Sequence, residues 1–183
     1  MTKKISKRST MFIAQGAAIA AMYAVLTIAQ NLLLPGTASW AVQFRVSEAM
    51  TVLAFFTPAA IPGLTVGCII ANISSVTAGL GFYDMFFGSI ATLLAALTMY
   101  ALRNVCVKGI PFVGLLMPAL FNGIIIGFEI EFFFIQSMKG FNFIEFLITG
   151  GCVALGELVV LLVLGIPMTL IIKRQHLDKE LIK

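Results

Sequence analysis

The sequence predicts an all-α integral membrane protein, a compact bundle of six transmembrane helices with both termini in the cytoplasm. First, 60% of its 183 residues are hydrophobic and its mean hydropathy is +1.05, well above the values of soluble domains. Second, its continuous apolar runs approach or exceed the ~20 residues that a helix needs to cross a bilayer. Third, its Lys and Arg residues fall mostly on one expected side of the membrane.

The chain, residues 1–183, is expected to form a single membrane domain with a basic cytosolic N-terminus at 1–10 and a cytosolic tail at 173–183. The expected spans are residues 11–34, 44–57, 61–79, 84–103, 110–135 and 144–172. The apolar region of the first span is longer than that of a cleavable signal peptide, so we expect an uncleaved helix.

The second and third spans are separated by TPAAIP, Thr57 to Pro62, whose two prolines predict a turn or a sharp kink. The distribution of positive charge decides between the two. With six spans, ten of the twelve Lys and Arg residues face the cytoplasm, and only Arg45 and Lys139 lie outside. With five spans, five lie inside and seven outside. Because positive charge favours the cytoplasmic side, we expect a turn and six spans.

In this orientation the polar side chains gather toward the outer half of the membrane. They are Glu48, Asn72, Asp84, Glu129, Glu131 and Glu145, with Asn122 and Glu157 at about mid-depth. Ionisable side chains in lipid are costly and usually functional. We therefore expect a cavity that is open to the outside or capped there.

The fifth and sixth spans carry the deepest of these groups. Asn122 and Glu129 are seven residues apart and share a helix face. Glu131 is rotated by roughly 200° from Glu129, so we expect Glu129 to face inward and Glu131 to face the headgroup region. Glu157 has no charged neighbour within a turn of its helix. It is therefore protonated, paired across the bundle or bound to a ligand.

The stretch VQFRVSEAM, Val42 to Met50, places two opposite charges three residues apart at the start of a hydrophobic helix. In a structural interpretation, Ser47 is the N-cap, Glu48 is a first-turn acid favoured by the helix dipole, and Arg45 extends to the interface. In a functional interpretation, Arg45 and Glu48 share a face and line a site.

The neighbours Trp40 and Gln43 favour the functional interpretation. An indole that stacks on a ring, together with an amide, a guanidinium and a carboxylate that read the ring edge, suits a flat heterocycle.

The first span carries small residues at four-residue spacing, which let helices approach closely in lipid. They are Ala14, Ala17, Ala18, Ala21 and Ala24. They either pack within the chain or form a docking surface for a partner subunit. Gly123 and Gly127 are expected to serve internal packing.

The sequence carries no recognisable nucleotide-hydrolysis, metal-binding or catalytic motif. It has no GxxxxGK[ST] phosphate loop, its single histidine, His176, lies in the tail, and its three cysteines are isolated. We expect no catalytic residue, no metal site and no cofactor. The chain is therefore expected to be a solute-binding subunit powered by other proteins.

VQFRVSEAMTVLAFFTPAAIPGLTVGCIIAN together with YDMFFGSIATLLAAL resembles the QueT family of substrate-binding S components of energy-coupling factor (ECF) transporters. The resemblance implies a multi-pass protein of a bacterial plasma membrane that docks onto a transmembrane coupling subunit driven by two cytosolic ATPase subunits. It assigns Ala17 and Ala21 to the AxxxA motif that meets the coupling subunit. The implied substrate is a queuosine precursor, a 7-deazaguanine, or queuine.

The expected substrate-binding residues are Trp40, Gln43, Arg45, Glu48, Asn72, Tyr83, Asp84, Asn122, Glu129 and Glu157. One of Glu48, Glu129 or Glu157 would accept the donor edge of the base. Arg45, Gln43, Asn72 or Asn122 would donate to its carbonyl. Trp40, Phe82 or Tyr83 would cover the ring, and Asp84 would meet an aminomethyl cation.

Three alternatives remain open at the level of sequence. The first is an S component for another vitamin-like solute, because such proteins share a scaffold while their pockets differ. The second is an autonomous proton-coupled carrier that uses Glu157. The third is a structural or enzymatic membrane protein.

Overall fold

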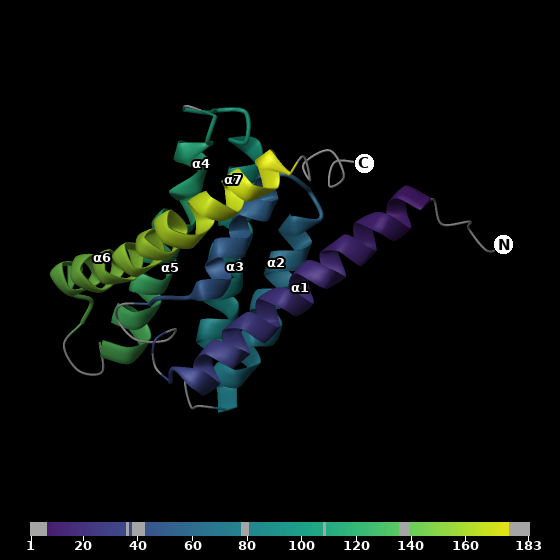
Figure 1. Ribbon diagram of the computed structural model, residues 1–183. Coiled ribbons are helices and arrows are strands. Elements are labelled where there is room, and N and C mark those ends of the chain that lie inside the picture. The colour runs from purple at the N-terminus through teal and green to yellow at the C-terminus, as the bar shows by residue number, and fades with distance from the viewer. Residues whose placement is uncertain are drawn as a thin grey trace.

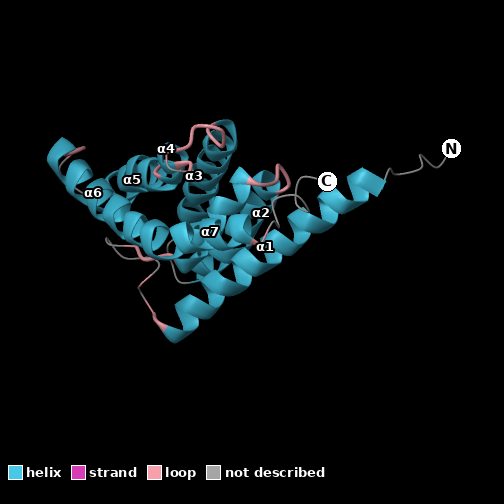
Figure 2. Cartoon of the chain, turned by 45° about the horizontal axis from the view of Figure 1, so that its top comes forward, coloured by secondary structure: helices cyan, strands magenta, loops and turns pink. Residues whose placement is uncertain are grey.

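The computed structural model describes residues 7–35, 37, 43–77, 81–107, 109–135 and 140–175, and the side chains of 74–77 and 81 are outside the description. Within these ranges the regular elements are helices joined by loops and turns (Figure 2), and Val107 and Ile110 form one isolated β-bridge. The expectation of an all-α protein is confirmed.

The elements follow the apolar segments of the sequence. In chain order they are α1 (Lys7–Leu33), η1 (Val46–Phe55), α2 (Ala60–Thr77), α3 (Gly81–Ala101), α4 (Phe112–Leu115), α5 (Met117–Glu129), η2 (Ile130–Ile135), α6 (Phe143–Val160), η3 (Leu161–Gly165) and α7 (Ile166–Arg174). η1 is a 3₁₀-helix, and η2 and η3 are π-helices. Pro118 and Pro167 stand in the first turns of α5 and α7, where a missing N–H costs little.

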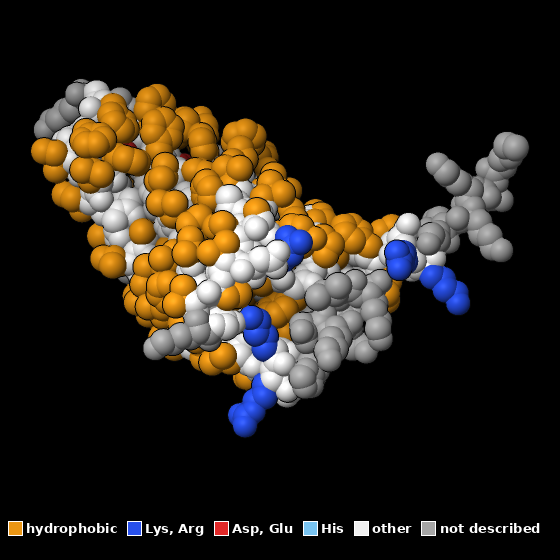
Figure 3. All heavy atoms as spheres, turned by 90° about the horizontal axis from the view of Figure 1, so that it is seen from above, with side chains coloured by type: hydrophobic (Ala, Val, Ile, Leu, Met, Phe, Trp, Pro, Cys, Tyr) orange, Lys and Arg blue, Asp and Glu red, His pale blue; other side chains and the backbone are white. Residues whose placement is uncertain are grey.

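In the described part of the chain, four helical segments are long and apolar enough to cross a membrane. They are residues 7–33, 82–101, 112–135 and 143–174, and residues 46–55 and 60–73 form shorter apolar helices. Many large apolar side chains, such as Ile13, Leu32 and Leu155, are exposed, and apolar atoms cover most of the surface in Figure 3. Such a surface suits a lipid environment, as expected for a multi-pass membrane protein.

The expected second span, residues 44–57, differs from the structure. Its ordered core is η1, which has 10 residues. At about 2.0 Å of rise per residue this 3₁₀-helix is about 20 Å long, short of the ~30 Å hydrocarbon layer. Residues 47–55 are all buried, because α1, α2, α3, α6, η3 and α7 surround them. η1 is thus the core of the bundle and is not a lipid-facing helix.

The break at Thr57 to Pro62 is a turn, as expected. η1 ends at Phe55, α2 begins at Ala60, and the chain between them includes hydrogen-bonded turns. The Thr57 hydroxyl donates to Gln15 Oε1 at 3.2 Å, which fixes this turn beside the first half of α1.

The helices pack in chain order, α1 against α2, α2 against α3, α3 against α5 and α5 against α6 (Figure 1). Glycines allow two of these approaches. A methyl group on Gly67 of α2 would lie 2.9 Å from the Ala20 carbonyl oxygen of α1. One on Gly127 of α5 would lie 2.5 Å from Cα of Gly150 in α6. Gly123 meets α6 in the same way, so the expected internal packing of Gly123 and Gly127 is confirmed.

One end of the bundle is basic. Lys173 Nζ donates to the Gly109 carbonyl oxygen at 2.6 Å, so the end of α7 lies beside the segment that joins α3 to α4. The N-terminal turns of α1 project beyond the other helices (Figure 1). Figure 3 looks onto this side and shows Lys and Arg side chains on its surface.

Candidate functional site

Residues 43–48 enter the interior of the bundle directly before η1. The Arg45 and Glu48 side chains are buried, with exposed fractions of 4% and 0%. Arg45 itself occupies the N-cap position of η1, and Ser47 lies inside the helix. The structural interpretation, with Ser47 as the cap and Arg45 at the interface, is therefore wrong. The physical reason is that the chain at the start of η1 lies inside the bundle, so neither side chain reaches the surface of the protein.

α1 holds this segment with polar side chains of its inner face. The Tyr23 hydroxyl donates to Glu48 Oε1, and Thr27 Oγ1 donates to Ser47 Oγ at 2.6 Å. Glu48 Oε2 has no hydrogen-bond partner among the described residues. Tyr23 thus fixes one carboxyl oxygen of Glu48, and the other is buried without a described hydrogen-bond partner.

α6 approaches the same segment at Gly156. A methyl group at this position would collide with the backbone N, C and O atoms of Gln43, so only glycine allows the contact. The next residue, Glu157, accepts a hydrogen bond from Asn122 Nδ2 of α5 at 3.1 Å. From the sequence, Glu157 is expected to be protonated, paired across the bundle or bound to a ligand. The structure shows that Glu157 has a partner across the bundle, Asn122. Its Oε2 atom is nonetheless buried and unpartnered within the described residues.

α2 and α3 bring a third group of polar atoms. Asn72 Nδ2 donates to the Asp84 carbonyl oxygen at 3.2 Å and lies 3.5 Å from Cys68 Sγ. A methyl group on Gly88 of α3 would lie 2.8 Å from Asn72 Nδ2 and 4.0 Å from an Arg45 terminal nitrogen. The guanidinium therefore lies between these helices and η1.

Glu129 and Glu131 are both buried. The expectation of an inward Glu129 is confirmed, and that of a headgroup-facing Glu131 is wrong. The π-helix η2 begins at Ile130, so the α-helical rotation used for that expectation does not hold. Glu131 Oε1 accepts from the Asn142 backbone N–H at 2.9 Å and fixes the start of α6.

Arg45 is the only buried Lys or Arg in the described ranges. It interacts electrostatically with buried carboxyl groups from η1, α3, α5 and α6. These are Glu48, Asp84, Glu129 and Glu157. Each of the four has an oxygen with no hydrogen-bond partner among the described residues. Because buried carboxyl groups need donors, the arrangement suits a ligand rich in N–H groups.

The aromatic candidates differ in position. Tyr83 is 48% exposed and stacks on Phe133 with ring centroids 4.1 Å apart, and Phe82 is more exposed still. Their contact with a ligand stays a prediction. Trp40 lies outside the described residues.

Sequence reasoning missed Tyr23, Thr27, Gln30 and Gly156. The first three stand at positions i, i+4 and i+7 of α1, a spacing that places polar groups on one face. That spacing was a usable signal. The sequence holds no comparable signal for Gly156, because its contact with Gln43 joins residues far apart in the chain.

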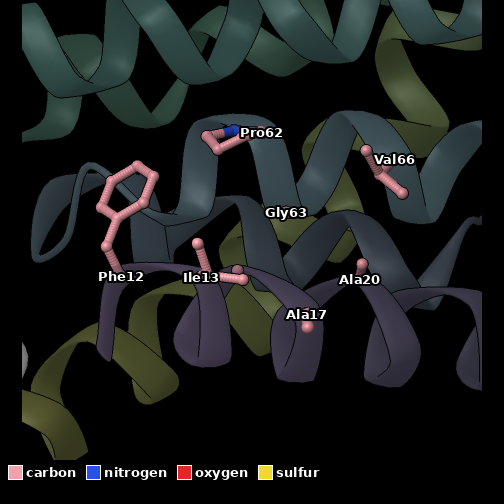
Figure 4. A pocket seen from close by; sticks show the side chains of 8 residues that line it. Phe12, Ile13, Ala17, Ala20, Pro62, Gly63 and Val66 are labelled. Atoms are coloured by element: carbon pink, nitrogen blue, oxygen red, sulfur yellow. The ribbon is translucent and has the colours of Figure 1, made fainter. Parts of the chain in front are cut away.

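The outer face of α1 exposes Ala14, Ala17, Ala18 and Ala21, whereas Ala24 is buried. Beside it, α1 and α2 form an apolar groove of about 260 Å³ (Figure 4). Ala17 lines this groove together with Phe12, Ile13 and Val66.

Two comparisons with known proteins agree. The family model described as QueT transporter matches residues 13–174, which include the described site residues and Ala17 and Ala21. The chain is also 31% identical over 176 residues to the queuosine precursor transporter QueT of Lactococcus lactis subsp. cremoris (strain MG1363), covering 96% of this chain and 100% of that protein. No solved structure matches the chain.

Proposed function

This chain belongs to the QueT transporter family, and from that premise we propose that it is the high-affinity substrate-binding subunit of an ATP-driven ECF uptake transporter. Its substrate is a queuosine precursor of the 7-deazaguanine type, or queuine. The name of the Lactococcus relative supports the substrate class. ATP hydrolysis belongs to two cytosolic partner subunits.

The observation that carries the proposal is a set of buried carboxyl oxygens near Arg45 that have no hydrogen-bond partner among the described residues. A guanine-like edge presents an N–H and an amino group side by side, which a carboxylate accepts together. Glu48 and Glu157 are suited to this task because a neighbour, Tyr23 or Asn122, orients the carboxylate through one oxygen and the other oxygen has no described partner. The oxygen that is already bonded retains a second lone pair for the substrate. These two residues are therefore assigned to the donor edge.

Arg45 is assigned to the carbonyl group of the base, because a guanidinium offers several donors in a fixed plane. Asn72 is less suited, since Nδ2 already contacts Asp84 and Cys68. An aminomethyl cation on the substrate is assigned to Asp84 or Glu129, each of which has a buried, unpartnered oxygen in the described part.

We propose that the chain crosses the membrane six times, with residues 43–57 around η1 forming the second crossing inside the bundle, and that both termini lie in the cytoplasm of a bacterial cell. The basic side of the bundle supports this orientation (Figure 3). Residues 43–48 then lie toward the outside. Solute enters from the outside, and the subunit reorients when a coupling subunit binds α1.

The coupling subunit is proposed to dock on the outer face of α1 at Ala17 and Ala21. Both are exposed, and small residues allow a partner helix to approach closely in lipid. The adjacent apolar groove between α1 and α2 offers further surface for such a helix (Figure 4).

Binding of a solute panel by the purified full chain in detergent tests the proposal. Nitrile and aminomethyl deazaguanines and queuine are compared with riboflavin, folate and thiamine by calorimetry. Submicromolar binding of a deazaguanine alone supports the substrate class. Binding of a vitamin in its place would overturn that class.

A second experiment tests the energy source. Uptake is measured in cells with and without the coupling and ATPase subunits, and with an uncoupler. Uptake that requires these subunits supports the ECF role. Uptake that persists without them and stops with the uncoupler would instead favour an autonomous proton-coupled carrier.

A further inference from the structure

Three polar side chains on the inner face of α1 contact the backbone and side chains of residues 44–48. Tyr23, Thr27 and Gln30 are buried, with exposed fractions of 0%, 1% and 7%. We name them the α1 polar row. Each would be expensive to bury without a hydrogen bond, and each finds its partner in the segment that carries Arg45 and Glu48.

Gln30 brackets Arg45. Its Nε2 atom donates to the Phe44 carbonyl oxygen, and its Oε1 atom accepts from the Val46 backbone N–H at 2.8 Å. The peptide groups on both sides of Arg45 are therefore held by one amide. Arg45 has an extended backbone at φ −86° and ψ 99°, and its carbonyl oxygen accepts from the Glu48 backbone N–H at 3.0 Å. Gln30 therefore adds bonds to the Phe44 carbonyl oxygen and the Val46 N–H, which flank Arg45.

Tyr23 and Thr27 continue the row toward η1. The Tyr23 hydroxyl fixes one oxygen of Glu48, which determines the direction of the other. Thr27 bonds to Ser47, the residue directly before Glu48. These four hydrogen bonds reach Phe44, Val46, Ser47 and Glu48, and the Arg45 backbone lies between the two bonds of Gln30.

We propose that the α1 polar row positions Arg45 and Glu48 for substrate, so that Tyr23, Thr27 and Gln30 set affinity without touching the ligand. The proposal rests on the proposed function for the identity of that ligand. A site whose side chains are held before binding loses less conformational freedom when the ligand arrives. Loss of one contact should therefore weaken binding about tenfold.

The row also lies on the same helix as the exposed Ala17 and Ala21. Any movement of α1 acts directly on residues 44–48, because rigid helices transmit displacement to the groups bonded to them.

Isosteric variants test the proposal in the purified full chain. Tyr23→Phe, Thr27→Val and Gln30→Met each remove hydrogen bonds of the row, and Thr27→Ser restores the hydroxyl. Tyr100→Phe, Thr169→Val and Gln15→Met are matched controls, because the described partners of these residues lie outside 43–48. Tyr100 contacts Arg103, Thr169 donates to the Gly165 carbonyl oxygen, and Gln15 accepts from Thr57. Affinity for the aminomethyl deazaguanine and hydrogen exchange of peptides covering 43–48 without ligand are measured for all variants.

The expected result is an affinity about tenfold weaker in the three row variants, faster exchange at 43–48, and values within about twofold of wild type in Thr27→Ser and the controls. Unchanged exchange overturns the proposal whether or not affinity changes. Faster exchange with unchanged affinity also overturns it, because the row would then be purely structural. If the wild type binds no deazaguanine, the substrate assignment fails, and exchange at 43–48 alone decides whether the row orders the segment.

Discussion

Asn122 of α5 donates from Nδ2 to Glu157 Oε1 of α6 at 3.1 Å, 35 residues along the chain. The bond fixes the orientation of a fully buried carboxyl group and leaves Oε2 without a partner in the described part of the protein. A purely structural acid would satisfy both oxygens, as most buried polar groups do. The one-sided bond therefore favours a role for Glu157 in binding.

Glu157→Gln should weaken deazaguanine binding about 10- to 100-fold, because an amide replaces one acceptor of a charge-assisted hydrogen bond with a donor. The melting temperature should stay the same or rise, since a buried carboxyl group is costly. Calorimetry and thermal unfolding in detergent measure the two effects. Glu145→Gln is the control, because Glu145 lies exposed in the first turn of the same helix. Equal affinity of the Glu157 variant and wild type would contradict the assignment.

Gly156→Ala should weaken binding at least tenfold, because the new methyl group would collide with the Gln43 backbone and displace the segment that carries Arg45. We expect a loss of stability of about 1–3 kcal/mol as well, the usual cost of overpacking. Gly151→Ala on the same helix is a sharp control, since no described atom lies within 4 Å of its added methyl group. That variant should bind normally and gain up to about 1 kcal/mol from its higher helix propensity. Similar behaviour of the two variants would exclude the proposed contact.

The fold class and most helix positions were predictable because long apolar runs in lipid have few alternatives to a helix. A helix was predicted at residues 44–57, where η1 lies, but its short 3₁₀ form was not, although its composition is as apolar as that of its neighbours. Its shortness follows from burial on all sides, a property of the assembled bundle. Composition alone does not distinguish a buried 3₁₀ segment from a lipid-facing span.

The site was predictable in its residue types and less so in its contacts. Gln43, Arg45, Glu48, Asn72, Asp84, Asn122, Glu129 and Glu157 are all buried, as the cost of charge in lipid suggested. Glu131 was misassigned because a π-helix changed its direction. Contacts such as Gly156 with Gln43 depend on tertiary packing, and sequence spacing carries no signal of them.

Arg45→Lys and Arg45→Met separate the geometry of the guanidinium from its charge. Arg45→Lys should weaken binding about tenfold because an ammonium cannot reproduce a planar set of donors. Arg45→Met should abolish measurable binding and cost about 3 kcal/mol of stability, since four buried carboxyl groups would lose their shared cation. Affinity and chemical unfolding are measured in detergent. Arg174→Met at the end of α7 is the control, and normal binding by Arg45→Met would contradict the role given to Arg45.

Ala17→Trp and Ala21→Trp should abolish assembly with the coupling subunit while leaving deazaguanine affinity within about twofold of wild type, because a large side chain blocks close helix approach. Both residues are exposed on α1, whereas Tyr23, Thr27 and Gln30 are buried, so the new side chain can extend away from the interior. Co-purification with affinity-tagged coupling and ATPase subunits reports assembly, and calorimetry reports binding. Leu155→Trp adds the same side chain at an exposed position on α6 and should assemble normally. Assembly of both alanine variants would move the docking surface away from this face, and a joint loss of binding and assembly would show that the substitutions distort α1 itself.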